Sequence, residues 1–475
     1  METKHLDCDV LVIGAGSAGI EAYQAASSAG AYCILAERGP LGTTAQRSGD
    51  VPTALLQAAG QCCMHLKDAQ NFGLKHKLST GFDNSEVLNA MRQVRARSTN
   101  DILSFIYKIP ETQRIIGQVR FLDPNRVTVN EETMISFKCA VIATGASPAI
   151  PYELGRLGGI KTSNDFFEQD RLPKSLAIFG SGLIGLSLGQ ALSNLGVEVT
   201  VFGDGRIWKL TDEQVTAVAR ELLQHEFSFE VSSELTAIEK VGESYGIYYL
   251  DESRYENFLV ADQVLAAGIR IPNLDELNLR ALGLSYNEHG LINMNYETMQ
   301  TEMPHIFAAG DAAQNSMSTA RARREGSLAG LNAARFPNLK ESAVPCEAAM
   351  TFTSPGLAVV GMSLDEMKSR ARQGHHFVAA EVRLDDGRYR IIRREGGIIR
   401  LYCDEETHLP LGAEICAEGA DHLAHFLTLA MRQKLTVEDL ASFDFYHPSL
   451  EEAVGRVSLS ALKALKRSGK KYYAG

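Results

Sequence analysis

Two glycine-rich turns of the form Gly-x-Gly-x-x-Gly constrain the fold of this 475-residue chain most strongly. The first comprises Gly14, Gly16 and Gly19, after the aliphatic run 9–13 and before helix-forming residues. A second apolar run ends at Glu37, eighteen residues after Gly19. In such a βαβ unit the three glycines permit a tight turn, approach of a pyrophosphate and close helix packing, while the acid suits a ribose. The sequence therefore predicts a dinucleotide-binding unit.

The pattern recurs in the middle of the chain. Residues 175–179 form an apolar run, Gly180, Gly182 and Gly185 form the turn, and 197–202 supply a second strand. Two such units predict two dinucleotides bound to one chain. The alternative is a structural βαβ unit that binds nothing. We disfavour it because three glycines have no packing need unless something approaches the backbone.

Two further strand ends carry small and polar residues. Strand 139–143 runs into Thr144 and Gly145, and strand 305–309 runs into Gly310-Asp311. In open α/β sheets, ligands sit at the carboxyl ends of strands. From about residue 345 the pattern changes to short alternating strands, 377–383 and 388–393, with two helical stretches. This favours an antiparallel α+β module at the C-terminus.

Composition narrows the class of function. Lys and Arg number 47 against 58 Asp and Glu, so the net charge is −11, and without a basic block we expect no nucleic acid partner. No apolar run approaches the ~20 residues of a transmembrane segment. Nor do the first residues read as a signal peptide. The eight cysteines lack CxxC and metal-ligand spacing, which predicts no metal site and reduced thiols in a cytoplasmic enzyme.

Together these landmarks resemble the pyridine nucleotide–disulfide oxidoreductases, especially the dihydrolipoamide dehydrogenase branch, over essentially the whole chain. The residues that carry the resemblance are Gly14–Gly19, Glu37, Ala143–Gly145, Gly180–Gly185, Gly268, Pro272–Asn273, Ala309–Asp311, Glu325–Gly326, Phe352–Thr353, His447–Pro448 and Glu452. The resemblance implies an α/β fold with two Rossmann-like dinucleotide-binding domains and a C-terminal α+β dimerisation domain. It also implies a homodimer.

The resemblance assigns a nucleotide to each unit. FAD would be held by Gly14, Gly16, Gly19, Glu37, Thr144, Gly145 and Asp311, and NAD(P)H by Gly180, Gly182, Gly185 and Gly268. The implied domains are an FAD domain of residues 1–150 and 273–342, an NAD(P) domain of residues 151–272, and an interface domain of residues 343–475.

The family's redox-active disulfide has no counterpart here. With Gly42-Thr43 and Pro52 as anchors, Thr44 and Asp50 stand where the two cysteines would be. The nearest thiols, Cys62 and Cys63, are adjacent and on a predicted helix, where a bridge is strained. We interpret them as ordinary thiols.

Two further departures occur together. Ala54 replaces the family's lysine beside the flavin, and Ser187 replaces the glutamate that pairs with it. Losing one partner of a partly buried ion pair costs ~3–5 kcal/mol, whereas losing both avoids that cost. We expect a lower flavin potential without the lysine.

The choice between NADH and NADPH stays open. Gly203 stands where an acid would bind the adenosine ribose, Asp204 follows it, and Arg206 is close enough to meet a 2′-phosphate. The segment from Gly268 to Pro272 is also one residue longer than in the family.

Near the C-terminus, His447 and Glu452 match the family's acid–base pair. In relatives the histidine of the partner subunit acts as general base toward a dithiol. Here it is predicted to protonate a quinone or another acceptor, and the alternative is an interface hydrogen bond only. Arg321, Arg323 and Arg324 are interpreted as a solvated helix face.

The predicted function is an FAD-dependent NAD(P)H oxidoreductase that passes hydride to a small-molecule acceptor other than a disulfide. Quinones, dyes and the other nicotinamide nucleotide are the candidates. One alternative is dihydrolipoyl dehydrogenase activity, as similarity would suggest. Another is a flavin-bound redox sensor or assembly subunit with little turnover.

Overall fold

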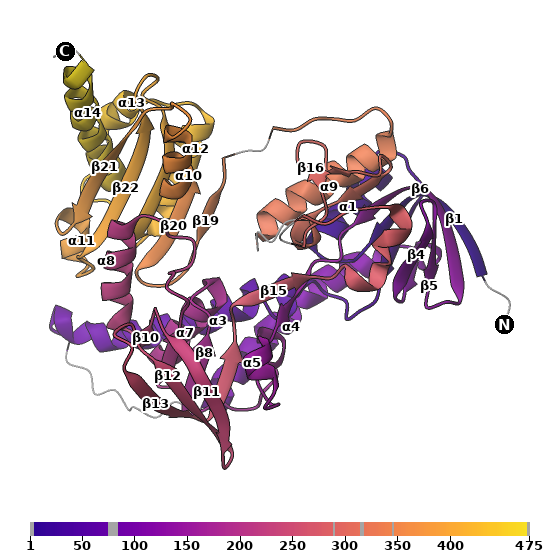
Figure 1. Cartoon of the computed structure of the whole chain (residues 1–475), viewed down its shortest axis with the longest axis horizontal. Helices are drawn as coiled ribbons and strands as arrows, with labels where there is room; N and C mark the ends of the chain where they lie inside the picture. Colours follow the sequence, from indigo (N-terminus) through magenta and orange to yellow (C-terminus); the bar gives the residue numbers. More distant parts are fainter. Residues whose placement is uncertain (1–3, 75–83, 288–289, 314–317, 344–345, 473–475) are drawn as a thin grey trace. The chain divides into compact units, whose positions relative to one another are not determined.

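The computed structural model describes residues 4–74, 84–287, 290–313, 318–343 and 346–472 (Figure 1). The chain divides into two compact units, each built from three separate stretches. Unit 1 comprises Met1–Pro52, Asn89–Ala149 and Ile269–Val344, and unit 2 comprises Thr53–Leu88, Ile150–Gly268 and Pro345–Gly475.

Unit 1 contains the first predicted βαβ unit in the centre of a nine-stranded sheet. β1 (Lys4–Ile13) lies between β2 (Cys33–Glu37) and β6 (Thr133–Ile142) and is parallel to both. Residues 10–12 of β1 are fully buried, as expected of a parallel strand that is covered on both faces. The remaining strands are β3 (Arg114–Ile116), β4 (Val119–Asp123), β5 (Arg126–Val129), β16 (Met294–Asn295), β17 (Gln300–Thr301) and β18 (Ile306–Ala308).

Helices cover this sheet and a small ribbon adjoins it. α1 (Ser17–Ser28) follows the first glycine turn and packs along α9 (Thr319–Arg335) (Figure 1). The ribbon pairs β7 (Ala146–Ala149) with β15 (Ile269–Pro272) in antiparallel register. The other helices that lie wholly or partly in unit 1 are α2 (Thr44–Arg47), α3 (Asp50–Asp68), α4 (Asn84–Lys108) and the 3-10 turns Glu111–Gln113, Asp275–Leu277, Leu279–Leu282 and Gly310–Ala312.

Unit 2 contains the second predicted βαβ unit. β8 (Ser175–Phe179) lies between β9 (Glu198–Phe202) and β14 (Gln263–Ala266), all parallel, and α7 (Leu183–Asn194) follows the second glycine turn. The other elements of this part are β10 (Ser228–Glu230), β11 (Glu234–Val241), β12 (Ser244–Leu250), β13 (Glu256–Ala261), α5 (Tyr152–Gly155), α6 (Ser163–Phe166), α8 (Glu213–Gln224) and the 3-10 turn Ala69–Phe72.

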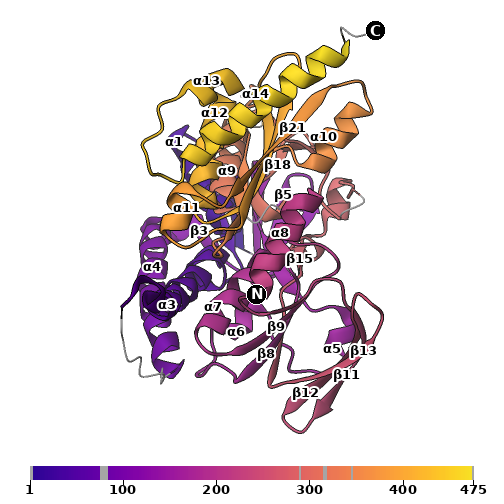
Figure 2. The ribbon, with the colours of Figure 1, turned by 90° about the vertical axis from the view of Figure 1, so that its left-hand side faces the viewer.

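The C-terminal module of unit 2 is a five-stranded antiparallel sheet in the order β19-β20-β23-β22-β21. One face packs on α12, α13 and α14, and α14 crosses the strands in Figure 2. The opposite face packs on α10 and α8. The bounds are β19 (Ala348–Met350), β20 (Gly356–Gly361), β21 (Phe377–Leu384), β22 (Gly397–Asp404), β23 (Pro410–Ala417), α10 (Leu364–Ala371), α11 (Gly387–Ile391), α12 (Ala420–Arg432), α13 (Val437–Ser442) and α14 (Glu452–Tyr472).

The strand predicted at 388–393 is wrong. Residues 387–391 form the short helix α11, and the strand that pairs with β21 is β22, which begins at Gly397. Tyr389 turns inward and is buried, whereas its neighbours Arg388 and Arg390 are exposed. The alternation of polar and apolar residues therefore reflects one turn of helix with a single buried side chain. The period of a strand and the period of a helix are indistinguishable over so few residues.

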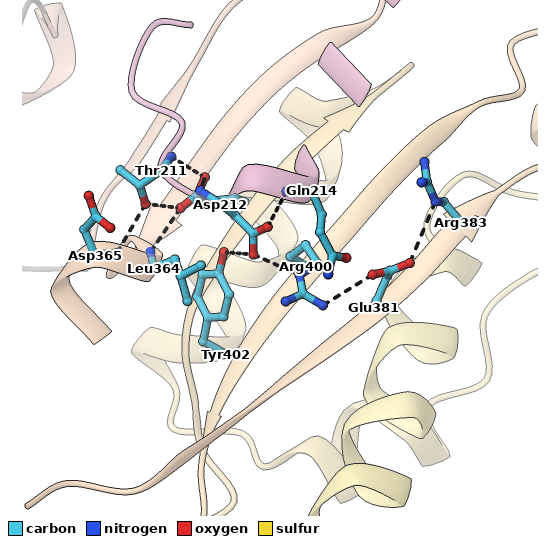
Figure 3. Close-up of polar contacts among 10 residues, drawn as sticks. Thr211, Asp212, Gln214, Leu364, Asp365, Glu381, Arg383, Arg400 and Tyr402 are labelled. Carbon is cyan, nitrogen blue, oxygen red and sulfur yellow. Dashed lines mark hydrogen bonds and ion pairs between the residues drawn. The ribbon is translucent and has the colours of Figure 1, made fainter. Parts of the chain in front are cut away.

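A buried polar network ties the start of α8 to the C-terminal sheet (Figure 3). Glu414 is fully buried and accepts hydrogen bonds from the Thr211 and Asp212 amides at 2.8 and 2.9 Å. Asp212 in turn accepts from Arg400 at 2.9 Å and from the Tyr402 hydroxyl at 3.0 Å. Burial and the neighbouring carboxylates raise the pKa of Tyr402 far above its ordinary value, so it stays a donor.

Replacing Arg400 is expected to destabilise the fold. Arg400→Gln leaves the Asp212 carboxylate, 2% exposed, without its positive partner. We expect the free energy of unfolding to fall by ~3 kcal/mol, measured by urea denaturation. Arg383→Gln is the matched control, because its side chain is 51% exposed and lies 3.8 Å from Glu381. That control is expected to change stability by less than ~0.5 kcal/mol, and equal effects of the two variants would contradict the account.

Candidate active site

The first glycine turn combines two packing requirements with one open position. A Cβ on Gly14 would lie 2.3 Å from the Ala143 carbonyl oxygen, and one on Gly19 would lie 1.8 Å from that of Gly14. Gly14 also has a φ of +107°. A Cβ on Gly16 would approach no atom of the chain closer than 4.0 Å. The chain itself thus requires the outer glycines, whereas the middle one leaves space beside the start of α1 for another molecule.

A cavity of about 390 Å³ opens at the carboxyl ends of β1, β2 and β6. Its lining includes Gly14, Glu37, Thr144, Ser147 and Asn273. The Glu37 carboxylate accepts hydrogen bonds from the Ala15 and Gly39 amides, at 2.6 and 2.8 Å. The acid is therefore fixed at the rim of the glycine turn.

The turn at Thr144 and Gly145 is held by Asn273, which the sequence indicated only through the family resemblance. The Asn273 side-chain amide donates to the Thr144 carbonyl oxygen at 2.9 Å, and its backbone amide donates to that of Gly145 at 2.9 Å. The Thr144 hydroxyl is buried and has no hydrogen-bond partner within the described parts of the chain. A buried hydroxyl without a partner is costly, so it fits a polar atom of a ligand.

The second glycine turn repeats the geometry of the first. A Cβ on Gly180 would lie 2.5 Å from the Gly268 nitrogen, and one on Gly185 would lie 1.8 Å from the Gly180 carbonyl oxygen. Only Gly182 faces open space, because a Cβ there would lie 3.9 Å from its nearest neighbour, the Ala267 oxygen. Packing therefore requires Gly180 and Gly185, contrary to the expectation that none of the three glycines has a packing need, and of the three only Gly182 indicates a ligand.

Packing explains why no acid ends β9. A Cβ on Gly203 would lie 2.6 Å from the Val231 carbonyl oxygen and 3.0 Å from the Ser181 hydroxyl. A carboxylate at this position is sterically excluded. Asp204 and Arg206 follow it and are both exposed, so both candidate contacts to an adenosine ribose lie outside the sheet.

The two positions assigned to the missing cysteines lie at helix starts. Thr44 begins α2 and Asp50 begins α3. The Thr319 hydroxyl donates to the Asp50 carboxylate at 2.7 Å. Cys62 is exposed and Cys63 is buried on α3, and both are free thiols. The helix predicted for this cysteine pair is therefore correct.

Sequence reasoning missed one guanidinium group near this region. Arg270 lies on β15, opposite Pro148 in β7, and donates a hydrogen bond to the Ala146 carbonyl oxygen. Burial lowers the pKa of Arg270 below its ordinary value, and the carboxylates of Asp311 and Asp50 oppose that change. The only signal in the sequence was the extra residue between Gly268 and Pro272.

Ala54 and Ser187 occupy neighbouring helices of unit 2. Ala54 is exposed on α3, and Ser187 is buried on α7. The two helices touch at Gly60, where a Cβ would lie 2.8 Å from the Ala191 carbonyl oxygen. The effect of the paired loss on the flavin potential stays a prediction.

His447 and Glu452 form the predicted pair. His447 Nδ1 lies 2.8 Å from Glu452 Oε1 at the start of α14, and the histidine side chain is 76% exposed. Because a carboxylate only accepts hydrogen bonds, Nδ1 carries the proton. Nε2 is then the ring nitrogen that carries the lone pair in the neutral imidazole.

The interpretation of the arginine run as a solvated face is wrong for Arg321. This side chain is 19% exposed and pairs with Glu325, which is 1% exposed, at 2.6 Å. Glu325 also accepts from the Gly310 amide at 3.0 Å, beside Asp311. Arg323 fits the interpretation, being 51% exposed and 3.9 Å from Glu21.

Two features are absent from the described residues. They contain no group of three His, Cys, Asp or Glu side chains placed to hold a metal ion. Within the same residues, no helix has both the length and the apolar character needed to cross a membrane.

The comparisons with known proteins agree with this architecture. Residues 8–326 match the pyridine nucleotide-disulphide oxidoreductase family, and residues 348–457 match the dimerisation domain of that family. A mercuric reductase of Staphylococcus aureus is 31% identical over 469 residues, which cover 96% of this chain and 82% of the relative. A dihydrolipoyl dehydrogenase of Thermus scotoductus is 29% identical over 458 residues, covering 94% and 95%.

A solved structure shows the same fold. The HOCl-induced flavoprotein disulfide reductase RclA of Escherichia coli, as a Cu(II) complex, aligns with a TM-score of 0.80 and 19% identity. The alignment covers 95% of this chain and 99% of that one. The predicted fold class, two dinucleotide-binding domains and a C-terminal dimerisation domain, is thereby confirmed.

The chain belongs to the pyridine nucleotide-disulphide oxidoreductase family. It is an FAD-dependent oxidoreductase of that family, whose members use FAD and NAD(P)H. Similarity to the mercuric reductase and to the dihydrolipoyl dehydrogenase is about equal, so it supports the family and not one branch.

Proposed function

We propose that this protein is a homodimeric oxidoreductase that passes hydride from NAD(P)H through FAD to an acceptor other than a disulfide. The observation that carries the proposal is the pairing of two complete glycine turns with Thr44 and Asp50 at the cysteine positions. When it is bound, FAD supplies the group that accepts the hydride and then donates it. The chain's own residues bind, orient and exchange protons.

We assign FAD to unit 1. The Gly16 space and the start of α1 would receive the pyrophosphate, because free backbone N–H groups and the helix dipole favour an anion there. Glu37 would bind the ribose, and the buried Thr144 hydroxyl would find its partner on the cofactor. Gly145 and Asp311 complete this set.

We assign NAD(P)H to the second glycine turn in unit 2. Gly182 would admit the pyrophosphate, while Gly180 and Gly185 form the tight turn that presents it and Gly268 packs against Gly180. Asp204 favours the ribose hydroxyls of NADH and Arg206 favours a 2′-phosphate. The preferred nucleotide therefore depends on which of these two exposed residues meets the ribose.

His447 is proposed to deliver a proton to the reduced acceptor. Its hydrogen bond to Glu452 fixes the tautomer, and its exposure supports a role at a surface shared with a second subunit. The match to the dimerisation domain supports the homodimer. A cytoplasmic location stays a prediction from the cysteine content.

We do not assign to this protein the activities for which its relatives are named. Dihydrolipoyl dehydrogenase activity needs exchange between a protein thiolate and a disulfide, and neither a threonine nor an aspartate forms that bond. The exposed Cys62 is the thiol that would have to serve instead.

A cysteine variant tests the proposal. Cys62→Ala/Cys63→Ala is expected to keep NAD(P)H-dependent quinone reduction within about twofold of wild type, since no thiol takes part. Lipoamide and mercuric ion, assayed in the same screen, test the activities named for the relatives. Loss of most turnover in the double variant would contradict a disulfide-free route. Absence of turnover on every acceptor would favour the sensor alternative.

A further inference from the structure

A second cavity lies within unit 2, between the 3-10 turn that follows α3 and the segment around the end of α11. Its volume is about 630 Å³, which is in the range of small-molecule sites. The lining residues are Asn71, Phe72, Arg390, Ile391, Arg393 and Glu395. None of them belongs to a glycine turn or lines the cavity at β1, β2 and β6. The two proposed nucleotide sites therefore do not account for this cavity.

Two contacts hold the walls of the cavity together. Asp68 ends α3, and its carboxylate lies 2.5 Å from the Arg394 guanidinium. The guanidinium carbon of Arg393 lies 5.9 Å from the centroid of the Phe72 ring, which is within the range of a cation–π contact. Each contact joins residues that are far apart in the sequence. The cavity is therefore formed by the tertiary fold and not by one loop.

Positive charge predominates in the lining, which contains two arginines and one glutamate. Arg390 donates from Nε and Nη2 to the Asp385 carbonyl oxygen, at 3.1 and 2.8 Å. Because a guanidinium has five N–H donors, others remain for a ligand. Arg393 is exposed and, like Arg390, permanently charged. Such a pair of guanidinium groups favours an anion that accepts hydrogen bonds.

The backbone at Arg393 is a second indication of a ligand site. Its φ is +55°, the left-handed region in which a side chain costs free energy and glycine does not. Arg393 stands two residues after the end of α11, where glycine is the commonest residue in this conformation. A long charged side chain therefore occupies a position that suits glycine, and a role in binding accounts for it.

We propose that this cavity binds a small organic anion that carries an aromatic ring. Arg390 and Arg393 would bind the anionic group. Phe72 and Ile391 line the cavity and are both exposed, so they would pack against the ring. The inference is independent of the proposed reaction, because no lining residue has a part in it.

Calorimetric titration of the purified protein with 2-naphthoate tests the site. We expect one molecule to bind per chain with a Kd below about 1 mM, as for an efficient ligand of this size. The uncharged 2-naphthol and the ringless acetate should each bind at least about tenfold more weakly, because each lacks one half of the recognised chemistry. The affinity for 2-naphthoate should also fall as salt is added.

Arg393→Gly is the decisive variant, because it removes the charge at a position where glycine suits the backbone. It should bind 2-naphthoate at least about tenfold more weakly without a lower thermal midpoint, and Arg390→Gln should weaken binding similarly. Arg388→Gln is the matched control, since Arg388 is exposed on the same short helix but does not line the cavity. Its affinity should stay within about twofold of wild type.

Absence of saturable 2-naphthoate binding would overturn the proposal. Equal affinity in wild type and Arg393→Gly would do the same, because the ligand would then bind elsewhere on the protein. If Arg393→Gly lowers the thermal midpoint, Arg390→Gln decides the question with the backbone unchanged. The titration needs neither NAD(P)H nor an electron acceptor, so its result is separate from that of the proposed function.

Discussion

Gly16→Val is expected to yield a folded protein that purifies without FAD. Gly16 has φ −76° and ψ −175°, an extended conformation that valine adopts readily. Its side chain would meet no atom of the chain closer than 4.0 Å at Cβ. The added methyl groups would instead fill the space proposed for the pyrophosphate. We expect FAD affinity to fall at least ~100-fold, which is ~2.7 kcal/mol.

The measurement is the FAD content after gel filtration, with circular dichroism as the check on folding. The comparison is with wild-type protein stripped of FAD, which should have the same thermal midpoint as the variant. Gly19→Ala is the contrasting variant, because its Cβ would lie 1.8 Å from the Gly14 carbonyl oxygen and should disturb the fold itself. Full FAD occupancy in folded Gly16→Val would refute the assignment of FAD to this turn.

Gly182→Val is expected to keep FAD but to lose reduction by NAD(P)H. Gly182 has φ −81° and ψ −173°, so valine again fits the backbone, and the nearest atom to its Cβ is 3.9 Å away. Displacing the nucleotide pyrophosphate removes the alignment on which hydride transfer depends. We expect flavin reduction to slow at least ~100-fold at limiting NAD(P)H, or ~2.7 kcal/mol in the barrier.

Stopped-flow absorbance of the flavin gives this rate. Dithionite should still reduce the flavin of Gly182→Val completely, which shows that the cofactor is intact. Each glycine variant is also the control for the other, since they should lose different nucleotides. Wild-type reduction rates in Gly182→Val would mean that the second βαβ unit is structural, the alternative left open by the sequence.

The fold was predictable because its strongest signals are local. A buried strand, a glycine turn and a helix follow one another within about thirty residues, and the same order appears twice. The strand ends at Thr144 and Asp311 could be found for the same reason. The spacing of the glycines did not reveal which of them the packing of the chain itself requires. Packing requires Gly14 and Gly19 but not Gly16.

The remaining features depend on contacts between distant segments. Arg270 donates a hydrogen bond to the Ala146 carbonyl oxygen, and the carboxylates of Asp311 and Asp50 act on it electrostatically. All three residues are far from Arg270 in sequence. Arg321 is partly buried because it pairs with Glu325, a contact that the arginine run does not reveal. Periodicity over six residues likewise did not separate α11 from a strand, because tertiary packing decides such short elements.

The number of NAD(P)H equivalents that the protein takes up without oxygen tests most directly whether FAD works here without a redox-active disulfide. Wild-type protein is titrated anaerobically with NADH and, separately, with NADPH while the flavin spectrum is followed. We predict complete bleaching at a single equivalent per FAD with no thiolate–flavin charge-transfer band, because the flavin alone stores the two electrons of a hydride. Uptake of two equivalents with that band would contradict the account, since it would place a redox-active disulfide beside the flavin.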